Sequence, residues 1–104
     1  MRNFKSVLVA LMLLIPLMYA CQEGTDVVES GTYQGTIKEV EPEKTEIYVE
    51  TTDGKVLELY FNENTTLTRN GETAPFEELE EGGNVEVEVE KVGQRLEPIA
   101  VRIL

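Results

Sequence analysis

Two runs of alternating apolar and polar residues, separated by Asp53-Gly54, form the clearest pattern in the chain, from Thr45 to Phe61. Alternation with a period of two predicts strands, and Asp-Gly between two such runs predicts a β-hairpin. A two-residue loop would place Val49 opposite Glu58 and so mix apolar and charged side chains on one face. We therefore expect a three-residue loop, Thr52-Asp53-Gly54, with Gly54 left-handed and Val49 opposite Leu57. The predicted inner face is Ile47, Val49, Thr51, Leu57, Leu59 and Phe61.

Further strands are predicted on both sides of this hairpin. In residues 31–41, Tyr33, Gly35 and Ile37 share one face while Val40 is out of phase, which predicts a bulge near Lys38-Glu39. Residues 84–92 alternate Val with Glu, and residues 96–104 are expected to pair back on them. This register places Ile103, Val101 and Ile99 opposite Val85, Val87 and Val89, and Arg102 opposite Glu86. Pro98 cannot donate a ladder hydrogen bond, so an edge position or a bulge is expected there.

The segment between the hairpin and residue 84 predicts smaller elements. Residues 65–69 are compatible with a short strand, and Asn70-Gly71 predicts a tight turn. Residues 74–83 predict a single helical turn held by Phe76 and Leu79, which we interpret as a plug over one end of a barrel. Five main strands with one short helical turn between the third and fourth predict an all-β, OB-like five-stranded barrel. The acidic side chains of this turn, Glu77, Glu78, Glu80 and Glu81, are oxygen ligands suited to Ca²⁺, but their spacing matches no EF-hand loop and favours a solvated face.

The first 20 residues differ in composition from the rest of the chain. A basic start, MRNFK, precedes an apolar run too short for a comfortable membrane span, which predicts a signal peptide over residues 1–20. Cys21 is the only cysteine in the chain. Acylation of Cys21 explains its place directly after the leader, whereas ordinary cleavage after Ala20 would leave an unpaired thiol. We expect a lipidated cysteine and linker over residues 21–30, followed by the barrel domain over residues 31–104.

Charge and composition narrow the possible functions. Seven of the nine basic residues and all twenty acidic residues follow the leader, so the exported part carries a net charge of −13. This balance argues against nucleic acid as a partner and favours cationic partners, although acidity also serves solubility alone. The chain has no His, and its three Met lie in the leader, which argues against zinc, copper, haem, Ser-His and Cys-His chemistry. We expect no cofactor and no catalytic residues.

Two resemblances to known protein classes accompany these patterns. Leu17-Met18-Tyr19-Ala20-Cys21 resembles the lipobox of bacterial lipoproteins, with departures at Met18 and Tyr19. The resemblance implies a bacterial cell-envelope protein that is exported and anchored in the membrane by lipid on Cys21. The rest of the chain resembles small exported bacterial OB-like domains of unknown function, through Gly35-Thr36-Ile37, Ile47-Tyr48-Val49, Asp53-Gly54, Thr66-Leu67 and the run from Leu79 to Val87. That family has no catalytic residues to transfer.

The outer face of the central hairpin is the candidate binding face. In the expected register Glu46 lies opposite Tyr60, Tyr48 opposite Glu58, and Glu50 opposite Val56. The two tyrosines then lie diagonally on an acidic patch suited to a glycan or a cationic peptide, although such tyrosines also stabilise a sheet without binding anything. The predicted function is a non-catalytic binding or interaction domain. The alternatives are a structural component that contacts an envelope protein and a carboxylate-dependent hydrolase.

Overall fold

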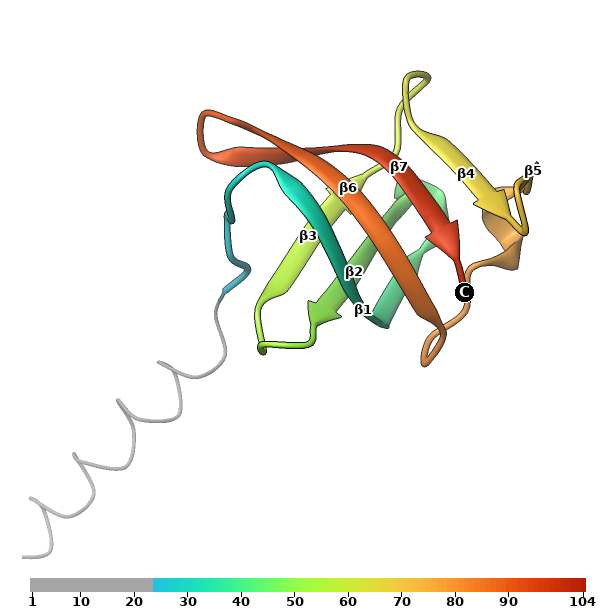
Figure 1. The fold of residues 1–104 in the computed structure, drawn as a ribbon, viewed down its shortest axis with the longest axis horizontal. Helices are drawn as coiled ribbons and strands as arrows, with labels where there is room; N and C mark the ends of the chain where they lie inside the picture. Colours follow the sequence, from blue (N-terminus) through green and yellow to red (C-terminus); the bar gives the residue numbers. More distant parts are fainter. Residues whose placement is uncertain (1–23) are drawn as a thin grey trace, which may run out of the picture.

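The computed structural model describes residues 24–104, and the predicted signal peptide and Cys21 lie outside that range. The described chain is an all-β domain (Figure 1). It also contains two short 3-10 turns. The strands are β1 (Gly31–Glu41), β2 (Glu46–Thr51), β3 (Val56–Tyr60), β4 (Thr66–Arg69), β5 (Glu72–Thr73), β6 (Asn84–Val92) and β7 (Arg95–Ile103), and the turns are η1 (Pro42–Lys44) and η2 (Phe76–Glu78).

The strands form one sheet in the order β3-β2-β1-β6-β7-β4-β5. All pairs are antiparallel except β4 with β7. The all-β class predicted from the sequence is confirmed, but the five-stranded closed barrel is not, because the sheet has seven strands and its ladder is open between β3 and β5. Two short strands extend the sheet beyond β7: β4 lies parallel to β7, and β5 pairs with β4 after a turn in which Thr65 N–H donates to the Asn62 carbonyl at 3.0 Å has separated β3 from β4.

The central hairpin has the predicted register. Val49 pairs with Leu57, Ile47 with Leu59, and Glu46 with Tyr60. Thr51 N–H donates to the Lys55 carbonyl at 2.7 Å, which leaves Thr52-Asp53-Gly54 as the three-residue loop, with Gly54 at φ 88°. The inner-face side chains are buried except for Phe61, which is half-buried. The requirement for one apolar face therefore set the loop length.

β1 bends around the domain at the predicted bulge, where its register with β2 shifts between Ile37 and Glu39. Gly35 lies against β2 so closely that an added Cβ would be 2.4 Å from the Glu50 carbonyl oxygen and 2.7 Å from Val49 Cγ1. Only a residue without a side chain permits this approach of two backbones. β1 can then pair with β2 on one edge and β6 on the other.

The β6–β7 register is confirmed over half its length. Val85 pairs with Ile103, Glu86 with Arg102, and Val87 with Val101, as predicted. Beyond Glu88 the register shifts, so Val89 pairs with Pro98. The expected pairing of Ile99 with Val89 is wrong because β7 bulges beside Pro98, and the Ile99 side chain is 37 % exposed.

Aliphatic side chains fill the core, and a helical turn closes one part of it. Val49, Leu59, Val85, Val87 and Val101 are fully buried. The predicted helical turn is present as η2, and Leu79 beside it is buried. The Phe76 ring packs edge-on against the Phe61 ring, with centroids 5.1 Å apart. The turn therefore covers the core where β3 ends.

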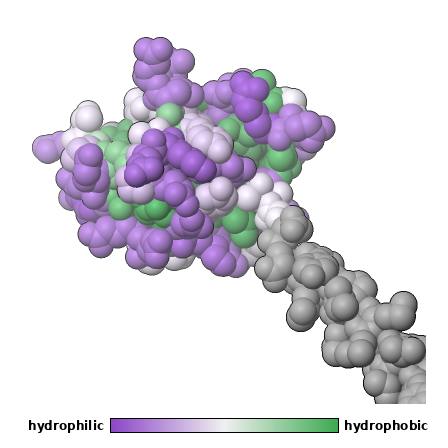
Figure 2. Space-filling model, turned by 180° about the vertical axis from the view of Figure 1, so that it is seen from behind, coloured by the Kyte–Doolittle hydropathy of each residue, from purple (hydrophilic) through white to green (hydrophobic). Residues whose placement is uncertain are grey.

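The surface is mainly hydrophilic. Figure 2 shows one face on which apolar side chains gather only in small, separate patches. No helix within residues 24–104 is long and apolar enough to cross a membrane.

Candidate functional site

The side chains of the candidate face on the central hairpin differ widely in their exposure to solvent. Tyr60 is 49 % exposed, Tyr48 and Glu58 are half-buried, and Glu46 is 0 % exposed. We expected Glu46 on an exposed acidic patch, but large aromatic neighbours occupy the same face, with Tyr60 directly opposite and Tyr48 two residues along β2. Glu50 is exposed at the other end of the face and lies 3.7 Å from Lys38 Nζ.

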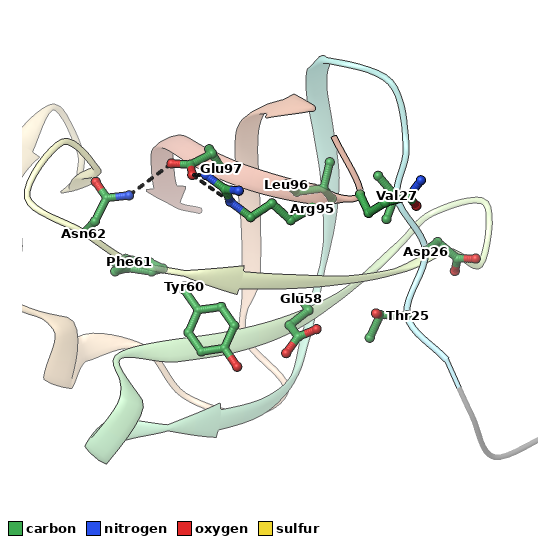
Figure 3. Close-up of a pocket in the computed structure, with 11 residues that line it drawn as sticks. Thr25, Asp26, Val27, Glu58, Tyr60, Phe61, Asn62, Arg95, Leu96 and Glu97 are labelled. Atoms are coloured by element: carbon green, nitrogen blue, oxygen red, sulfur yellow. Dashed lines mark hydrogen bonds and ion pairs between the residues drawn. The ribbon is translucent and has the colours of Figure 1, made fainter. Parts of the chain in front are cut away.

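A groove of about 200 Å³ lies beside Glu58 and Tyr60. Three segments form it: the N-terminal segment, the end of β3 with the residues after it, and the start of β7 with the turn before it. Figure 3 shows Glu58 and Tyr60 projecting side by side from β3, with Asp26 and Val27 at one end and Asn62 at the other. The lining residues are Thr25, Asp26, Val27, Glu58, Tyr60, Phe61, Asn62, Gln94, Arg95, Leu96 and Glu97.

Two hydrogen bonds fix the N-terminal wall of the groove. Asp26 N–H donates to the Val56 carbonyl at 2.7 Å, and Val56 N–H donates to Asp26 Oδ2 at 2.9 Å. Lys91 N–H donates to Ser30 Oγ at 2.9 Å, which holds the other end of the segment. Residues 24–30 have no regular secondary structure, as expected for a linker, but they are bound to the domain instead of hanging free.

The edge of β3 contributes backbone polar groups to the groove. The Lys55 carbonyl accepts from Thr51 N–H in β2, and Phe61 N–H donates to the carbonyl of Thr45 just before β2. Val56 therefore directs its N–H and carbonyl to the opposite edge, where Asp26 binds them. Backbone groups alternate in direction along a strand, so those of Glu58 and Tyr60 point to the same edge as those of Val56. β3 is the last strand of the sheet order, and an edge of this kind can pair with a ligand chain.

The opposite wall carries an ion pair. Arg95 Nη2 lies 2.6 Å from Glu97 Oε2, and Asn62 Nδ2 donates to Glu97 Oε1 at 3.3 Å. Glu97 therefore neutralises the only cationic side chain that lines the groove within residues 24–104. Asp26 and Glu58, in contrast, form no salt bridge with a described residue.

Three side chains on this face, Glu46, Tyr48 and Tyr60, have a raised pKa. Burial, followed by the neighbouring Glu58, raises the pKa of Glu46 above its ordinary 4.5. Burial and the charges of Glu58 and Glu46 raise the pKa of Tyr48, whose hydroxyl lies 3.4 Å from Glu58 Oε2. The Glu46 carboxyl is also the largest cause that raises the pKa of Tyr60 to about 12. Both tyrosines are therefore neutral hydrogen-bond donors at physiological pH.

The glutamates of the helical turn are dispersed. Glu78 Oε1 lies 2.7 Å from Arg69 Nε, and no three acidic, His or Cys side chains within residues 24–104 gather as a metal site would require. Two other depressions, of about 180 and 250 Å³, lie around the end of β7 and contain none of the candidate residues.

Sequence reasoning identified one side of the groove and missed the other. Tyr60 and Glu58 followed from the register of the hairpin, whereas Asp26 and Arg95 come from a presumed linker and a presumed turn. No local pattern marks those residues, because their role depends on the long-range placement of both segments beside β3. Comparison of the chain with protein-family models, curated proteins and solved structures found no match.

Proposed function

We propose that this chain is an exported bacterial envelope lipoprotein whose single domain is a non-catalytic binding module. The groove beside Glu58 and Tyr60 is the observation that carries the proposal. It offers a half-exposed aromatic ring, two acidic side chains that form no salt bridge within residues 24–104 and the polar edge of β3 within one concave site. These groups suit the reversible binding of a peptide or a glycan.

The connectivity of the strands supports an OB-like fold as the finer description. Strands β1, β2 and β3 follow one another as a meander, β1 also pairs with β6, and β6 pairs with β7. β4 lies parallel to β7, and β3 packs against β7 without a hydrogen-bonded ladder. OB-like domains bind their ligands on the face of the second and third strands and on loops beside it, where the groove lies.

Lipidation of Cys21 would hold this groove near the membrane. Thr25 lines the groove and lies four residues after Cys21, a span of at most about 14 Å. Residues 24–30 are bound to the domain, so the groove cannot move far from the anchor. A ligand at the membrane surface, such as part of the cell wall or an envelope protein, fits this geometry.

Mass spectrometry of the membrane-extracted protein tests the anchor. The proposal predicts a chain that begins at a Cys21 carrying acyl groups. A mature chain that begins at Gln22, or one with unmodified Cys21, would refute it.

Amide NMR spectra of the full chain in a neutral detergent test the binding site. Cell-wall oligosaccharide, tetralysine and Ca²⁺ are titrated separately, and a ligand should shift the amides of Asp26, Glu58, Tyr60 and Arg95 together. Tyr60→Thr should weaken the binding. Ile99→Thr, which replaces another partly exposed apolar side chain outside the groove, should leave the binding unchanged. Shifts around η2, or none with any ligand, would contradict the proposal.

A further inference from the structure

The most unusual side chain in the domain is Glu46. It is 0 % exposed, and neither carboxyl oxygen has a hydrogen-bond partner of good geometry. Within residues 24–104, no Lys or Arg lies within salt-bridge distance of it. Buried polar groups are nearly always hydrogen-bonded, and a buried carboxylate without a partner is costly. The cost of burying the Glu46 carboxyl in this way suggests that the group serves a function.

The groups around Glu46 are acidic or hydroxylic on every strand that contributes to this face. β3 supplies Glu58 and Tyr60, β2 itself supplies Tyr48, and the negative charge of Glu39 on β1 interacts with Glu46. Glu41 on β1 is the register partner of Glu46. Arg95, which lines the groove, is bound to Glu97, and Lys38 lies beside Glu50. Within residues 24–104, therefore, no Lys or Arg forms a salt bridge with either Glu46 or Glu58.

In the free domain a proton can supply the positive charge that none of the described side chains brings within salt-bridge distance of this pair. The Glu46 carboxyl is removed from water beside the negative charge of Glu58, so it holds its proton to a higher pH than an isolated carboxyl does. Burial is the first cause of the raised pKa of Glu46, and Glu58 is the second. Below the raised pKa of Glu46 the two carboxyls therefore carry one negative charge, and an external cation would favour two.

We propose that the Glu58–Tyr60 end of the groove binds the ammonium or guanidinium group of a cationic peptide, and that the Glu46–Glu58 pair releases its proton when it does. The inference rests on the proposed binding function of the groove and names its ligand class. The cation contacts Glu58 and the face of Tyr60, while Glu46 lies behind them and supplies the second negative charge. One proton leaves to solvent for each cation bound, so the charge of the complex balances.

Three observations favour a cationic peptide over a neutral glycan. The exported chain has a net charge of −13, which attracts cations from solution. The half-exposed ring of Tyr60 offers a face for a cation–π contact beside the carboxylate of Glu58. The backbone of β3 turns an unpaired edge toward the groove, where an extended peptide can form main-chain hydrogen bonds.

Isothermal titration calorimetry with tetralysine tests this inference on the full chain in neutral detergent. Runs in two buffers with different ionisation enthalpies count the protons released. We expect close to one proton per bound peptide at a pH where the pair is protonated, and an affinity that rises by up to about tenfold per pH unit in that range. Glu46→Gln should abolish the release, whereas Glu88→Gln, the same charge change on the exposed side of β6, should retain it.

The outcomes separate the inference from the proposed function. If tetralysine binds the groove and Glu46→Gln releases the same number of protons, the inference is wrong and the binding function stands. If only oligosaccharide binds, the ligand class is wrong and the function again stands. If neither ligand shifts an amide of the groove, both fail. Should Glu46→Gln not fold, Glu58→Gln gives the decisive comparison, since it must lose both the proton release and most of the affinity.

Discussion

Glu46 and Tyr60 lie directly opposite each other on β2 and β3, yet the carboxylate is 0 % exposed and the tyrosine is 49 % exposed. The usual arrangement is the reverse, because a charged group belongs in water and an aromatic ring belongs under cover. The buried carboxyl raises the pKa of Tyr60, so the two side chains interact across the ladder. Because Tyr60 lines the groove, this interaction couples the buried Glu46 carboxyl to the groove.

Replacing Glu46 with Leu should stabilise the domain. The substitution removes two buried oxygens that have no hydrogen-bond partner of good geometry among the described residues and leaves an apolar group of similar size, a change worth about 1–3 kcal/mol in the free energy of unfolding. Urea denaturation at neutral pH measures it. Glu88→Leu, on an exposed position of β6, serves as the control and should change stability by less than about 0.5 kcal/mol. A Glu46→Leu domain less stable than the wild type would show that the carboxyl stabilises the fold.

The pH dependence of stability should carry the sign of a raised acid pKa. The folded state holds the Glu46 proton above the ordinary pKa of 4.5, where the unfolded chain has lost it. The stabilisation is therefore complete below pH 4.5 and disappears as the pH rises through the raised pKa. The difference in unfolding free energy between wild type and Glu46→Gln, measured in urea at several pH values, should fall over this range. A difference that rises with pH would mean that the pKa is lowered.

Asp26→Ala should open the N-terminal wall of the groove. It removes the carboxylate that accepts a hydrogen bond from Val56 N–H, an interaction with a charged group worth about 1.5–3 kcal/mol. We expect faster hydrogen exchange at the Val56 amide and weaker tetralysine binding. Glu29→Ala, which removes only an exposed ion pair with Lys91, should leave that amide protected. Unchanged exchange at Val56 in Asp26→Ala would contradict the role given to this wall.

Gly35→Ala should destabilise the sheet where β1 crosses β2. The new methyl group would meet the Glu50 carbonyl oxygen, a backbone atom that cannot rotate away. We therefore expect the free energy of unfolding to fall by about 1–3 kcal/mol. Thr32→Ala, on an exposed position of the same strand, is the matched control for thermal denaturation. Equal melting temperatures for the two variants would show that β1 and β2 can separate at this point.

The local pattern predicted most of the sheet because one face of each strand must be apolar. That requirement determined the loop of the central hairpin, the bulge after Ile37 and the pairing of Val87 with Val101. It could not predict the position of β4 beside β7, since that position depends on contacts between distant segments. The lost pairing of Ile99 has a local cause in Pro98: a bulge was one of the two arrangements expected there, but its effect on the pairing of Ile99 with Val89 was not anticipated.

The candidate site was less predictable than the fold. The register correctly placed Glu46, Tyr48, Glu58 and Tyr60 on one face, but periodicity does not report how deeply a side chain is covered. The burial of Glu46 depends on the size of the two tyrosines beside it. The groove itself required Asp26 and Arg95, which reach β3 from opposite ends of the domain sequence.

The carboxyl carbon of Glu46, followed by NMR against pH with and without tetralysine, gives the most direct test of this account. The account predicts a midpoint above the ordinary value in the free protein and a lower midpoint when the peptide is bound, because the cation replaces the proton. A midpoint at the ordinary value in both titrations would show that Glu46 is neither perturbed by its burial nor coupled to the groove.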